Sequence, residues 1–540
     1  MGPPRSYNYL PLHFLYIFLL VPTGTAYSSW DAVFDTEDWI NHGGDLYNRR
    51  FAEEETKISP ITVSALRLKW EFYAGRDISA TPEILDKTLY FPSWNGYLYA
   101  VNALDGSLIW KQNLQELTGL NATGFVLNVN TTVSRATPTV ANDLLVVGIY
   151  GPAVVIAVER LSGKLVWSTR LDTHPSGVIT MSGTYLNGYF YVGTSSLEEE
   201  LSVEQCCTFQ GSFAKLDARS GAILWQTLML PDNYGKTGEY AGAAVWGSSP
   251  PIDIHRNLVY IATGNLYSVP ENISQCQERE NNQTKPTHPD ECIEPDNHSE
   301  SILALDLDTG KINWYHQLGG YDVWFFACNN LSTPDCPPGP NPDADFGESP
   351  MILSIFVNGK LRDIVVAVQK SGFAWALDRS NGSLIWSTEA GPGGLGGGGI
   401  WGAATDEKRV YTNIANSDHN NFTLKPSTKN TTAGGWVTMD AGTGQVLWST
   451  ADPANGTASG PVTVANGVLF GGSTNAKGPI YAMDARTGKI LWTNNTGATV
   501  YGGMSINDGC IYVGNGYKVS VGFINPSFTD GTSLFAYCVC

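Results

Sequence analysis

One pattern of apolar and polar positions recurs seven times along the chain. An apolar run ends in an acidic or amide residue, a turn containing Gly follows, and two residues, both apolar in six of the seven segments, lead to Trp, as in Ala482-Met-Asp-Ala-Arg-Thr-Gly-Lys-Ile-Leu-Trp492. Gly always lies four residues before Trp. Because Asp caps backbone N–H groups and Gly accepts a positive φ, the pattern predicts strand, tight turn, strand. The seven segments are 102–110, 159–167, 217–225, 306–314, 378–386, 440–448 and 484–492.

The spacing of these repeats predicts the fold. Successive repeat tryptophans are 44 to 89 residues apart, enough for a four-stranded sheet and its loops. An eighth tryptophan, Trp70, has no such turn before it, and the residues after Trp492 include no Trp strand. We therefore expect an all-β, eight-bladed β-propeller, closed by the N-terminal strand near Trp70 as the outer strand of the blade built by residues 500–540. Closure removes free sheet edges, and an open array of repeats is the alternative.

Composition agrees with this fold and excludes some partners. The 540 residues include 58 Gly and 29 Pro, with 11% aromatic and only 15% charged residues, which suits many short strands and tight turns. The net charge is −19 and there is no run of Lys or Arg, which argues against a nucleic-acid partner. We expect one propeller domain over residues 27–540.

The N-terminus predicts passage through the secretory pathway. Residues 1–26 combine Arg5, an apolar run over 10–21 and a small-residue site, which is typical of a cleaved signal peptide; an uncleaved anchor is the alternative. No later stretch has 18 apolar residues in a row, so we expect no membrane span in the mature chain. Glycosylation sequons favour a secreted glycoprotein, extracellular or in the cell wall or vacuole. They lie at Asn121, Asn130, Asn272, Asn282, Asn297, Asn330, Asn381, Asn421, Asn430, Asn455 and Asn494.

Nine cysteines fit an oxidising compartment. Cys276–Cys292 and Cys328–Cys336 would close short loops, and Cys510 would pair with Cys538 or Cys540. The odd number leaves one thiol over. No spacing typical of a zinc site or of haem attachment is present in the sequence.

The repeat resembles the tryptophan-docking motif of the quinoprotein alcohol dehydrogenases, eight-bladed propellers that carry pyrroloquinoline quinone (PQQ). The resemblance covers nearly the whole mature chain and is strongest to polyvinyl-alcohol dehydrogenase-like proteins. The segments that carry it are 39–50, Ser196-Leu-Glu-Glu, Cys206-Cys-Thr-Phe-Gln-Gly-Ser212, Val245-Trp-Gly-Ser-Ser-Pro250, Phe346-Gly-Glu-Ser-Pro350 and Gln369-Lys-Ser-Gly372. The resemblance implies PQQ and a divalent cation, with Ca²⁺ the expected ion because it takes oxygen ligands.

The resemblance also implies roles for single residues. Glu198 and Asn265 resemble the family's cation ligands, with a solvated loop charge and a turn residue as the alternatives. Trp246 resembles the tryptophan on which the quinone stacks, with core packing as the alternative. Cys206 and Cys207 resemble the family's adjacent disulfide, although two separate thiols with distant partners stay open.

Polar contacts to the quinone follow in the same way. Lys370 resembles the basic residue near the reactive carbonyls, where positive charge would stabilise a developing oxyanion. Arg135 would face a carboxylate, and a surface salt bridge is the alternative for both. Thr180 and Ser195 resemble hydroxyl contacts, and Trp401 would border the edge of the ring.

The chain departs from the family at the general base. The family's aspartate lies in a segment resembling Asp-x-Trp-Asp, and Phe325 stands at its place in Gly320-Tyr-Asp-Val-Trp-Phe325. A base must reach the proton that it removes. Asp322 is the expected base, with Asp345 as the alternative.

Two functions stay open. One is a secreted oxidoreductase that oxidises a small or polymeric alcohol with PQQ and passes electrons to a separate acceptor. The other is a noncatalytic propeller that serves as a binding scaffold, because fold alone does not fix function. Phe325 favours the scaffold, whereas Glu198, Asn265, Trp246 and the cysteine pair favour the enzyme.

Overall fold

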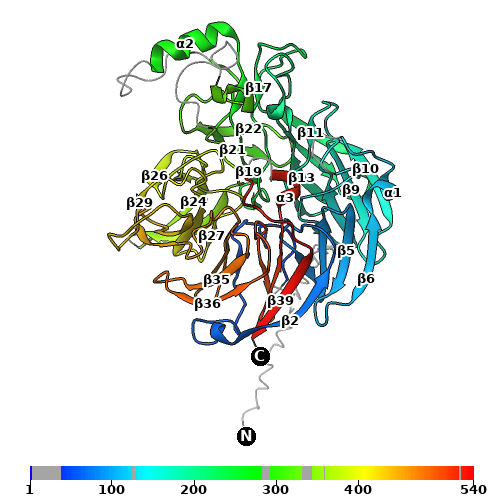
Figure 1. Cartoon of the computed structure of the whole chain (residues 1–540), viewed down its shortest axis with the longest axis vertical. Helices are drawn as coiled ribbons and strands as arrows, with labels where there is room; N and C mark the ends of the chain where they lie inside the picture. Colours follow the sequence, from blue (N-terminus) through cyan, green and yellow to red (C-terminus); the bar gives the residue numbers. More distant parts are fainter. Residues whose placement is uncertain are drawn as a thin grey trace. The chain divides into compact units, whose positions relative to one another are not determined.

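A computed structural model describes residues 1–2, 38–123, 129–281, 292, 294–330, 343–357, 359–521 and 525–539. Eight antiparallel sheets of four strands surround a common centre (Figure 1). The predicted signal peptide, residues 1–26, lies almost entirely outside the described residues, as do Cys336, Cys540 and the sequon at Asn282.

Seven of the sheets follow one another in chain order. The first is β3 (Glu83–Leu85), β4 (Thr88–Ser93), β5 (Tyr97–Asn102) and β6 (Leu108–Asn113), and the second is β7 (Thr139–Ala141), β8 (Leu144–Gly148), β9 (Val154–Glu159) and β10 (Leu165–Arg170). The third is β12 (Thr184–Leu186), β13 (Tyr189–Gly193), β15 (Ser212–Asp217) and β16 (Ile223–Leu228), and the fourth is β18 (Ile252–Asp253), β19 (Leu258–Ala262), β21 (Ser301–Asp306) and β22 (Ile312–Gln317). The fifth is β23 (Met351–Val357), β24 (Lys360–Val368), β25 (Phe373–Asp378) and β26 (Leu384–Glu389), and the sixth is β27 (Ala404–Thr405), β28 (Arg409–Ile414), β31 (Gly435–Asp440) and β32 (Val446–Ala451). The seventh is β33 (Thr463–Ala465), β34 (Val468–Gly472), β35 (Pro479–Asp484) and β36 (Ile490–Asn495).

The eighth sheet closes the ring as predicted. It consists of β37 (Ser505–Asn507), β38 (Cys510–Gly514) and β39 (Ser533–Val539), with the N-terminal strand β2 (Leu66–Tyr73) on its outer edge. β2 pairs antiparallel with β39, which places Trp70 opposite Ala536 (Figure 1). The expected eight-bladed propeller closed by the N-terminal strand is confirmed.

Tryptophan joins each blade to the next. The indole N–H of Trp110 donates to the carbonyl of Arg160 over 3.0 Å, and equivalent bonds of 2.9–3.2 Å recur around the ring. The last bond, from Trp492 to the carbonyl of Leu66, links the final repeat to the start of β2. Each contact therefore connects adjacent sheets rather than stabilising only its own.

The turn glycine is needed for this contact. Gly488 has φ +71°, and a Cβ there would lie 2.4 Å from the ring of Trp448 of the preceding repeat. Asp484 accepts hydrogen bonds from the backbone N–H groups of Arg486 and Thr487, which fixes the turn. The repeat thus encodes both the local turn and the surface against which the indole of the preceding repeat packs.

Short elements outside the blades shape the centre. β1 (Phe51–Ala52) adds a parallel fifth strand to β33, an addition that the repeat pattern did not predict. The small ribbons are β11 (Gly177–Val178) with β14 (Ser195–Ser196), β17 (Ala241–Gly242) with β20 (Leu266–Ser268), and β29 (Phe422–Thr423) with β30 (Asn430–Thr431). The helices are α1 (Leu114–Thr118), α2 (Glu271–Asn281) and α3 (Lys518–Val521), with 3₁₀ turns η1 (Val63–Ala65), η2 (Glu198–Glu200) and η3 (Phe326–Asn330).

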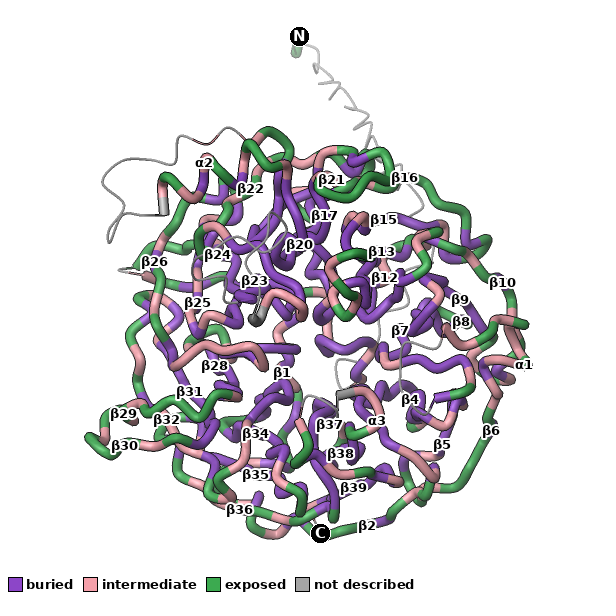
Figure 2. Tube along the Cα trace, turned by 45° about the horizontal axis from the view of Figure 1, so that its top comes forward, coloured by how far each residue is buried: buried purple, intermediate pink, exposed green. Residues whose placement is uncertain are grey.

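Burial follows the ring. The strands nearest the centre are buried, and exposed residues gather on the outer strands and turns (Figure 2). Two predicted disulfides are present, Cys276–Cys292 and Cys510–Cys538, and the second joins β38 to β39 in the closing blade. No helix in the described part of the chain combines the length and the apolar character that a membrane crossing needs.

Candidate active site

A cavity of about 310 Å³ lies among loops from most of the blades. This volume falls at the lower end of the range for small-molecule sites. Aromatic rings and charged groups share its wall. The lining includes Arg135, Tyr150, Thr180, Ser195, Glu199, Glu200, Trp246, Tyr267, Asp343, Asp345, Lys370, Trp401, Tyr501, Tyr517 and Phe528.

Two tryptophans form a corner of the cavity. The rings of Trp246 and Trp401 meet edge to face, with centroids 4.7 Å apart. The indole N–H of Trp246 donates to Asp345 Oδ2 over 3.1 Å. Gly264 and Gly347 leave room for this ring, since a Cβ at either position would lie within 3.4 Å of it. Trp246 is therefore fixed by its neighbours and half-exposed at the cavity, as a stacking platform requires.

Lys370 lies in a cluster of carboxylates. Its ammonium is 2.9 Å from Asp343 Oδ1 and 3.0 Å from Asp345 Oδ2, and its side chain is buried. Burial disfavours the charged ammonium, but the two carboxylates outweigh this effect and raise the pKa of Lys370. Burial also raises the pKa of the nearby half-buried Glu199 to about 8, against the opposing effect of Lys370. The charge of Lys370 is thus already matched within the protein.

Arg135 lies in a different environment. Its guanidinium is 3.5 Å from the ring centroid of Trp401 and 5.1 Å from that of Tyr517, within cation–π range. Within the described residues, no carboxylate lies at ion-pair distance from Arg135. A charged group in such a position can take an anionic ligand. In the part of the chain that the structure describes, the alternative of a surface salt bridge is not observed for Arg135.

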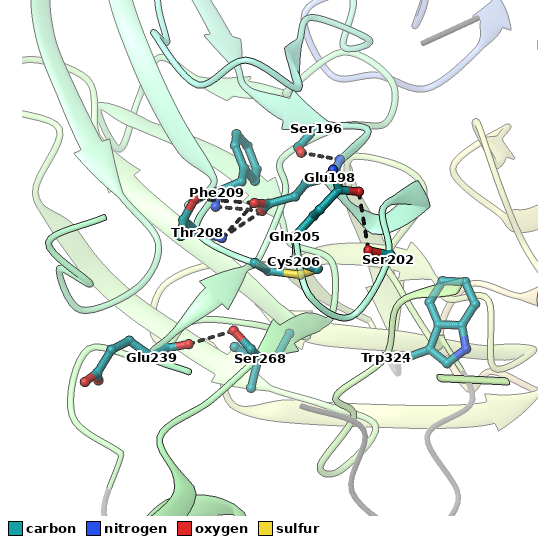
Figure 3. The surroundings of a disulfide bond; sticks show 12 residues. Ser196, Glu198, Ser202, Gln205, Cys206, Thr208, Phe209, Glu239, Ser268 and Trp324 are labelled. Atoms are coloured by element: carbon teal, nitrogen blue, oxygen red, sulfur yellow. Dashed lines mark hydrogen bonds between the residues drawn. A yellow bond between two sulfur atoms is a disulfide. The ribbon is translucent and has the colours of Figure 1, made fainter. Parts of the chain in front are cut away.

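Glu198, the predicted cation ligand, turns away from the cavity. Its carboxylate accepts from the backbone N–H groups of Thr208 and Phe209, each over 2.8 Å, and lies 3.2 Å from His174 Nε2 (Figure 3). It is buried and does not line the cavity, whereas the next residue in η2, Glu199, does. Glu198 therefore fixes the loop that carries the cysteine pair.

Cys206 and Cys207 are joined to each other, as expected (Figure 3). Both are buried in a cluster with Phe209, Tyr267 and Phe325. Tyr267 lines the cavity, so the cysteine pair supports the wall from behind. Phe325, at the place of the family's base, is fully buried in this cluster, where an aspartate would lack water.

Asp322 and Asn265 lie behind the cavity wall. Asp322 Oδ2 accepts from the backbone N–H of Ala344 over 2.6 Å, and burial raises the pKa of Asp322 to about 6. Asn265 Nδ2 donates to the carbonyls of Leu266 and Trp324. Neither side chain lines the cavity. Of the two candidate bases only Asp345 does, where its Oδ1 accepts from the N–H of Asn265 over 2.5 Å.

The remaining predicted contacts are on the cavity. Thr180 and Ser195 line it, and Thr180 Oγ1 donates to the carbonyl of Trp246 over 2.8 Å. Sequence reasoning missed Glu199, Asp343, Tyr501 and Tyr517. Glu199 directly follows the predicted ligand Glu198 in the acidic run of η2, so the sequence-based assignment was one residue away from it. Tyr501 and Tyr517 belong to the last blade, which has no repeat to place them.

Comparison with known proteins places this propeller and its cavity in a class. The PQQ_2 family model, described as outer membrane protein assembly factor BamB, matches residues 59–316 and 433–534. The chain therefore belongs to this family of propeller proteins, and its resemblance to the quinoprotein alcohol dehydrogenases is confirmed.

Two curated relatives are named polyvinylalcohol dehydrogenase. The protein of Pseudomonas sp is 28% identical over 519 residues, covering 89% of this chain and 73% of the relative. That of Sphingopyxis sp. (strain 113P3) is 27% identical over 545 residues, covering 93% and 76%. The structure of quinohemoprotein alcohol dehydrogenase ADHIIG from Pseudomonas putida HK5 matches with a TM-score of 0.71 and 18% identity, over 94% of this chain and 80% of that one. This structural match supports the fold.

Proposed function

We propose that the chain is a PQQ-dependent oxidoreductase that oxidises an alcohol group to a carbonyl. The observation that carries the proposal is Arg135, a guanidinium with no carboxylate at ion-pair distance among the described residues, at a cavity walled by Trp246 and Trp401. PQQ is a flat polycarboxylate, so it matches both an aromatic platform and an unpaired cation. Relatives named polyvinylalcohol dehydrogenase support the reaction class.

The residues present fit the quinone. Trp246 would lie against its ring and Trp401 at its edge. Arg135 would face a carboxylate, with Thr180 and Ser195 as hydroxyl partners in the same wall. Lys370 would lie near the reactive carbonyls, 5.2 Å from the ring of Trp246.

A carboxylate of this chain accounts for the proton transfer. When bound, PQQ supplies an ortho-quinone that accepts the two electrons and the hydrogen from the alcohol carbon. Asp345 is the carboxylate that we assign as general base, because it lines the cavity and would take the hydroxyl proton on Oδ2. Trp246 and Lys370 hold that oxygen at 3.1 and 3.0 Å, which fixes its direction. A separate acceptor for the electrons is part of the proposal.

A divalent cation, with Ca²⁺ as the expected ion, remains a prediction. Among the described residues no group of three or more His, Cys, Asp and Glu side chains is placed to hold a metal ion. The cavity carboxylates Asp343 and Asp345 already contact Lys370. Each of these two carboxylates is already matched by Lys370, and the role assigned to Asp345 does not depend on a metal ion. Glu199 and Glu200 are the acidic groups on the wall that a cation would reach without breaking an ion pair with Lys370.

The test is reconstitution of the purified protein. With PQQ added, we expect oxidation of a secondary alcohol coupled to reduction of an artificial dye, with Ca²⁺ varied separately. Binding of PQQ without turnover by any alcohol would favour a scaffold instead. Lack of PQQ binding would contradict the proposal.

We also propose that the protein is secreted and glycosylated. Disulfides Cys276–Cys292 and Cys510–Cys538 support an oxidising compartment. Asn381 and Asn455 are exposed, whereas Asn297 is 3% exposed and its amide donates to Glu294 Oε2 over 2.6 Å. Glycopeptide mapping of the secreted protein should find glycans at Asn381 and Asn455 and none at Asn297. A glycan on Asn297 of the folded protein would contradict the assignment of sites.

A further inference from the structure

The segment 39–50, which precedes the first full blade, reaches the cavity wall from behind. His42, in this segment, is buried, and its Nε2 lies 2.7 Å from the carbonyl oxygen of Trp401. The two residues are 359 positions apart in the chain. Arg50 is fully buried and donates to the backbone carbonyl of His42, to that of Val462 and to Thr463 Oγ1, which fixes the segment in the ring.

Trp401 is held in an unusual backbone conformation. Its φ is +70°, a left-handed conformation that is costly for a bulky residue and that persists only where its surroundings hold it. Its carbonyl accepts from Ser248 Oγ over 2.7 Å as well as from His42, and its own N–H donates to the carbonyl of Gly347. Its indole N–H donates to the hydroxyl of Tyr501 over 2.7 Å.

The hydrogen-bond pattern fixes the state of His42. A carbonyl only accepts, so Nε2 must carry the proton that it donates to Trp401. Nδ1 lies 3.1 Å from Thr81 Oγ1 and therefore accepts when the ring is neutral. Burial lowers the pKa of His42 well below its usual value, and Arg50 adds to this effect. The ring is thus neutral, with its proton on Nε2.

The position of Trp401 matters for two other groups. Its ring lies against Trp246 and carries the guanidinium of Arg135 at 3.5 Å. A shift of the Trp401 backbone would therefore move the ring of Trp401 relative to both Trp246 and Arg135.

We propose that His42 is a positioning residue for the cavity: by donating from Nε2 to the Trp401 carbonyl, it holds the Trp401 ring in the place that aligns Arg135 with Trp246 for an anionic aromatic ligand. The identity of that ligand as PQQ rests on the proposed function above. The positioning itself does not, because it concerns groups of this chain alone.

The first test uses near-ultraviolet circular dichroism of the protein without PQQ. His42→Leu removes the donor, and His42→Gln retains an N–H that can reach the same carbonyl. We expect His42→Leu to change the tryptophan bands and His42→Gln to restore most of the wild-type spectrum. The difference should vanish when both are compared in a Trp401→Phe background. A difference that persists in that background, or equal spectra of His42→Leu and wild type, would overturn the proposal.

The second test measures PQQ affinity by fluorescence quenching. Loss of one neutral hydrogen bond predicts about threefold to tenfold weaker binding in His42→Leu, with His42→Gln close to wild type. Asn41→Ala is the matched control, because Asn41 lies beside His42 in the same buried segment but donates to the carbonyl of Asp45. An equal loss of affinity in Asn41→Ala would show general damage and overturn a specific role for His42. Failure of wild type to bind PQQ would contradict the proposed function, while the spectra would still decide the positioning.

A third measurement keeps the proposal testable if His42→Leu does not fold. Nitrogen-15 NMR of wild-type protein labelled at histidine reports which ring nitrogen carries the proton. We expect one histidine that stays neutral from pH 5 to 8, with the proton on Nε2, and that His42→Gln removes its signal. A His42 signal with the proton on Nδ1 would overturn the proposal.

Discussion

Two cations face the same cavity, and their surroundings differ. Lys370 contacts Asp343 and Asp345 at 2.9 and 3.0 Å, so its charge is matched by the protein. Arg135 lies over aromatic rings and has no carboxylate at ion-pair distance among the described residues. The first arrangement holds the carboxylate that we propose as the base, whereas the second leaves positive charge for a ligand.

The difference separates stability from binding. Removing one partner of a buried ion pair leaves an uncompensated charge, which is strongly destabilising. Arg135 is only half-buried and contacts aromatic rings, so removing it should change the stability little and act mainly on what binds there. The two residues should therefore respond differently to substitution.

The largest effect is expected for Lys370→Met. Asp343 and Asp345 would keep their burial but lose their counter-ion, at a cost of about 3–5 kcal/mol in the free energy of unfolding. Urea denaturation followed by fluorescence measures this cost. Lys215→Met is the control, because Lys215 is also buried but its nearest carboxylate, on exposed Asp308, is 3.9 Å away. An equal loss of unfolding free energy in the two variants would contradict the claim that the ion pairs of Lys370 stabilise the fold.

Asp345→Asn should lower kcat by roughly 10²–10⁴ because the base would be lost. Asn has one acceptor oxygen, so it can keep the hydrogen bond from the indole of Trp246 or that from the N–H of Asn265, but not both. Asp322→Asn is the control, because Asp322 lies behind the wall and should retain turnover within a few-fold. The opposite result, with Asp322→Asn inactive and Asp345→Asn active, would return the base to Asp322.

Arg135→Gln should weaken PQQ binding with little change in stability. Loss of a charge-assisted contact to a carboxylate is worth about 2–3 kcal/mol, roughly 30-fold to 150-fold in Kd. The free energy of unfolding should change by less than about 1 kcal/mol, the size of the lost cation–π contact with Trp401. Titration with PQQ gives the Kd, and denaturation of the same preparation gives the free energy of unfolding. Large destabilisation without loss of affinity would contradict the comparison.

The smallest effect concerns pH. The pKa of Glu199 is about 8 in the folded protein, above its value of 4.5 when unfolded. Between these values the unfolded chain loses the proton that the folded chain keeps, so stability falls as pH rises from 4.5 to 8. Glu199→Gln should therefore gain about 1–2 kcal/mol relative to wild type at pH 8 and almost nothing at pH 4.5. Denaturation at both pH values checks this, with exposed Glu204→Gln as a control that should show no pH-dependent gain.

The repeat made the fold predictable, because one short pattern encodes a turn, a strand and a contact to the next blade. Counting the strands that each repeat provides predicted that the strand near Trp70 completes the blade formed after Trp492. The pairing of Trp70 with Ala536 confirms this prediction. β1 escaped prediction because it joins its sheet through backbone pairing and has no side-chain pattern of its own.

The site was only partly predictable from the sequence. Family-like segments identified Trp246, Lys370, Arg135 and Trp401, which the structure brings to one cavity. They indicated Glu198 as the cation ligand, whereas the next residue of the same 3₁₀ turn, Glu199, lines the cavity. They could not reveal that His42 contacts Trp401, since ring closure alone brings these distant segments together.

The central claim is that the unpaired Arg135 marks a site for an anionic quinone. Its most direct test is titration of the purified protein with PQQ, followed by absorbance and tryptophan fluorescence, in wild type and in Arg135→Gln. The account predicts saturation at one PQQ per chain in wild type and at least tenfold weaker binding in Arg135→Gln. Absence of saturable binding in wild type, or equal affinity in the two proteins, would contradict it.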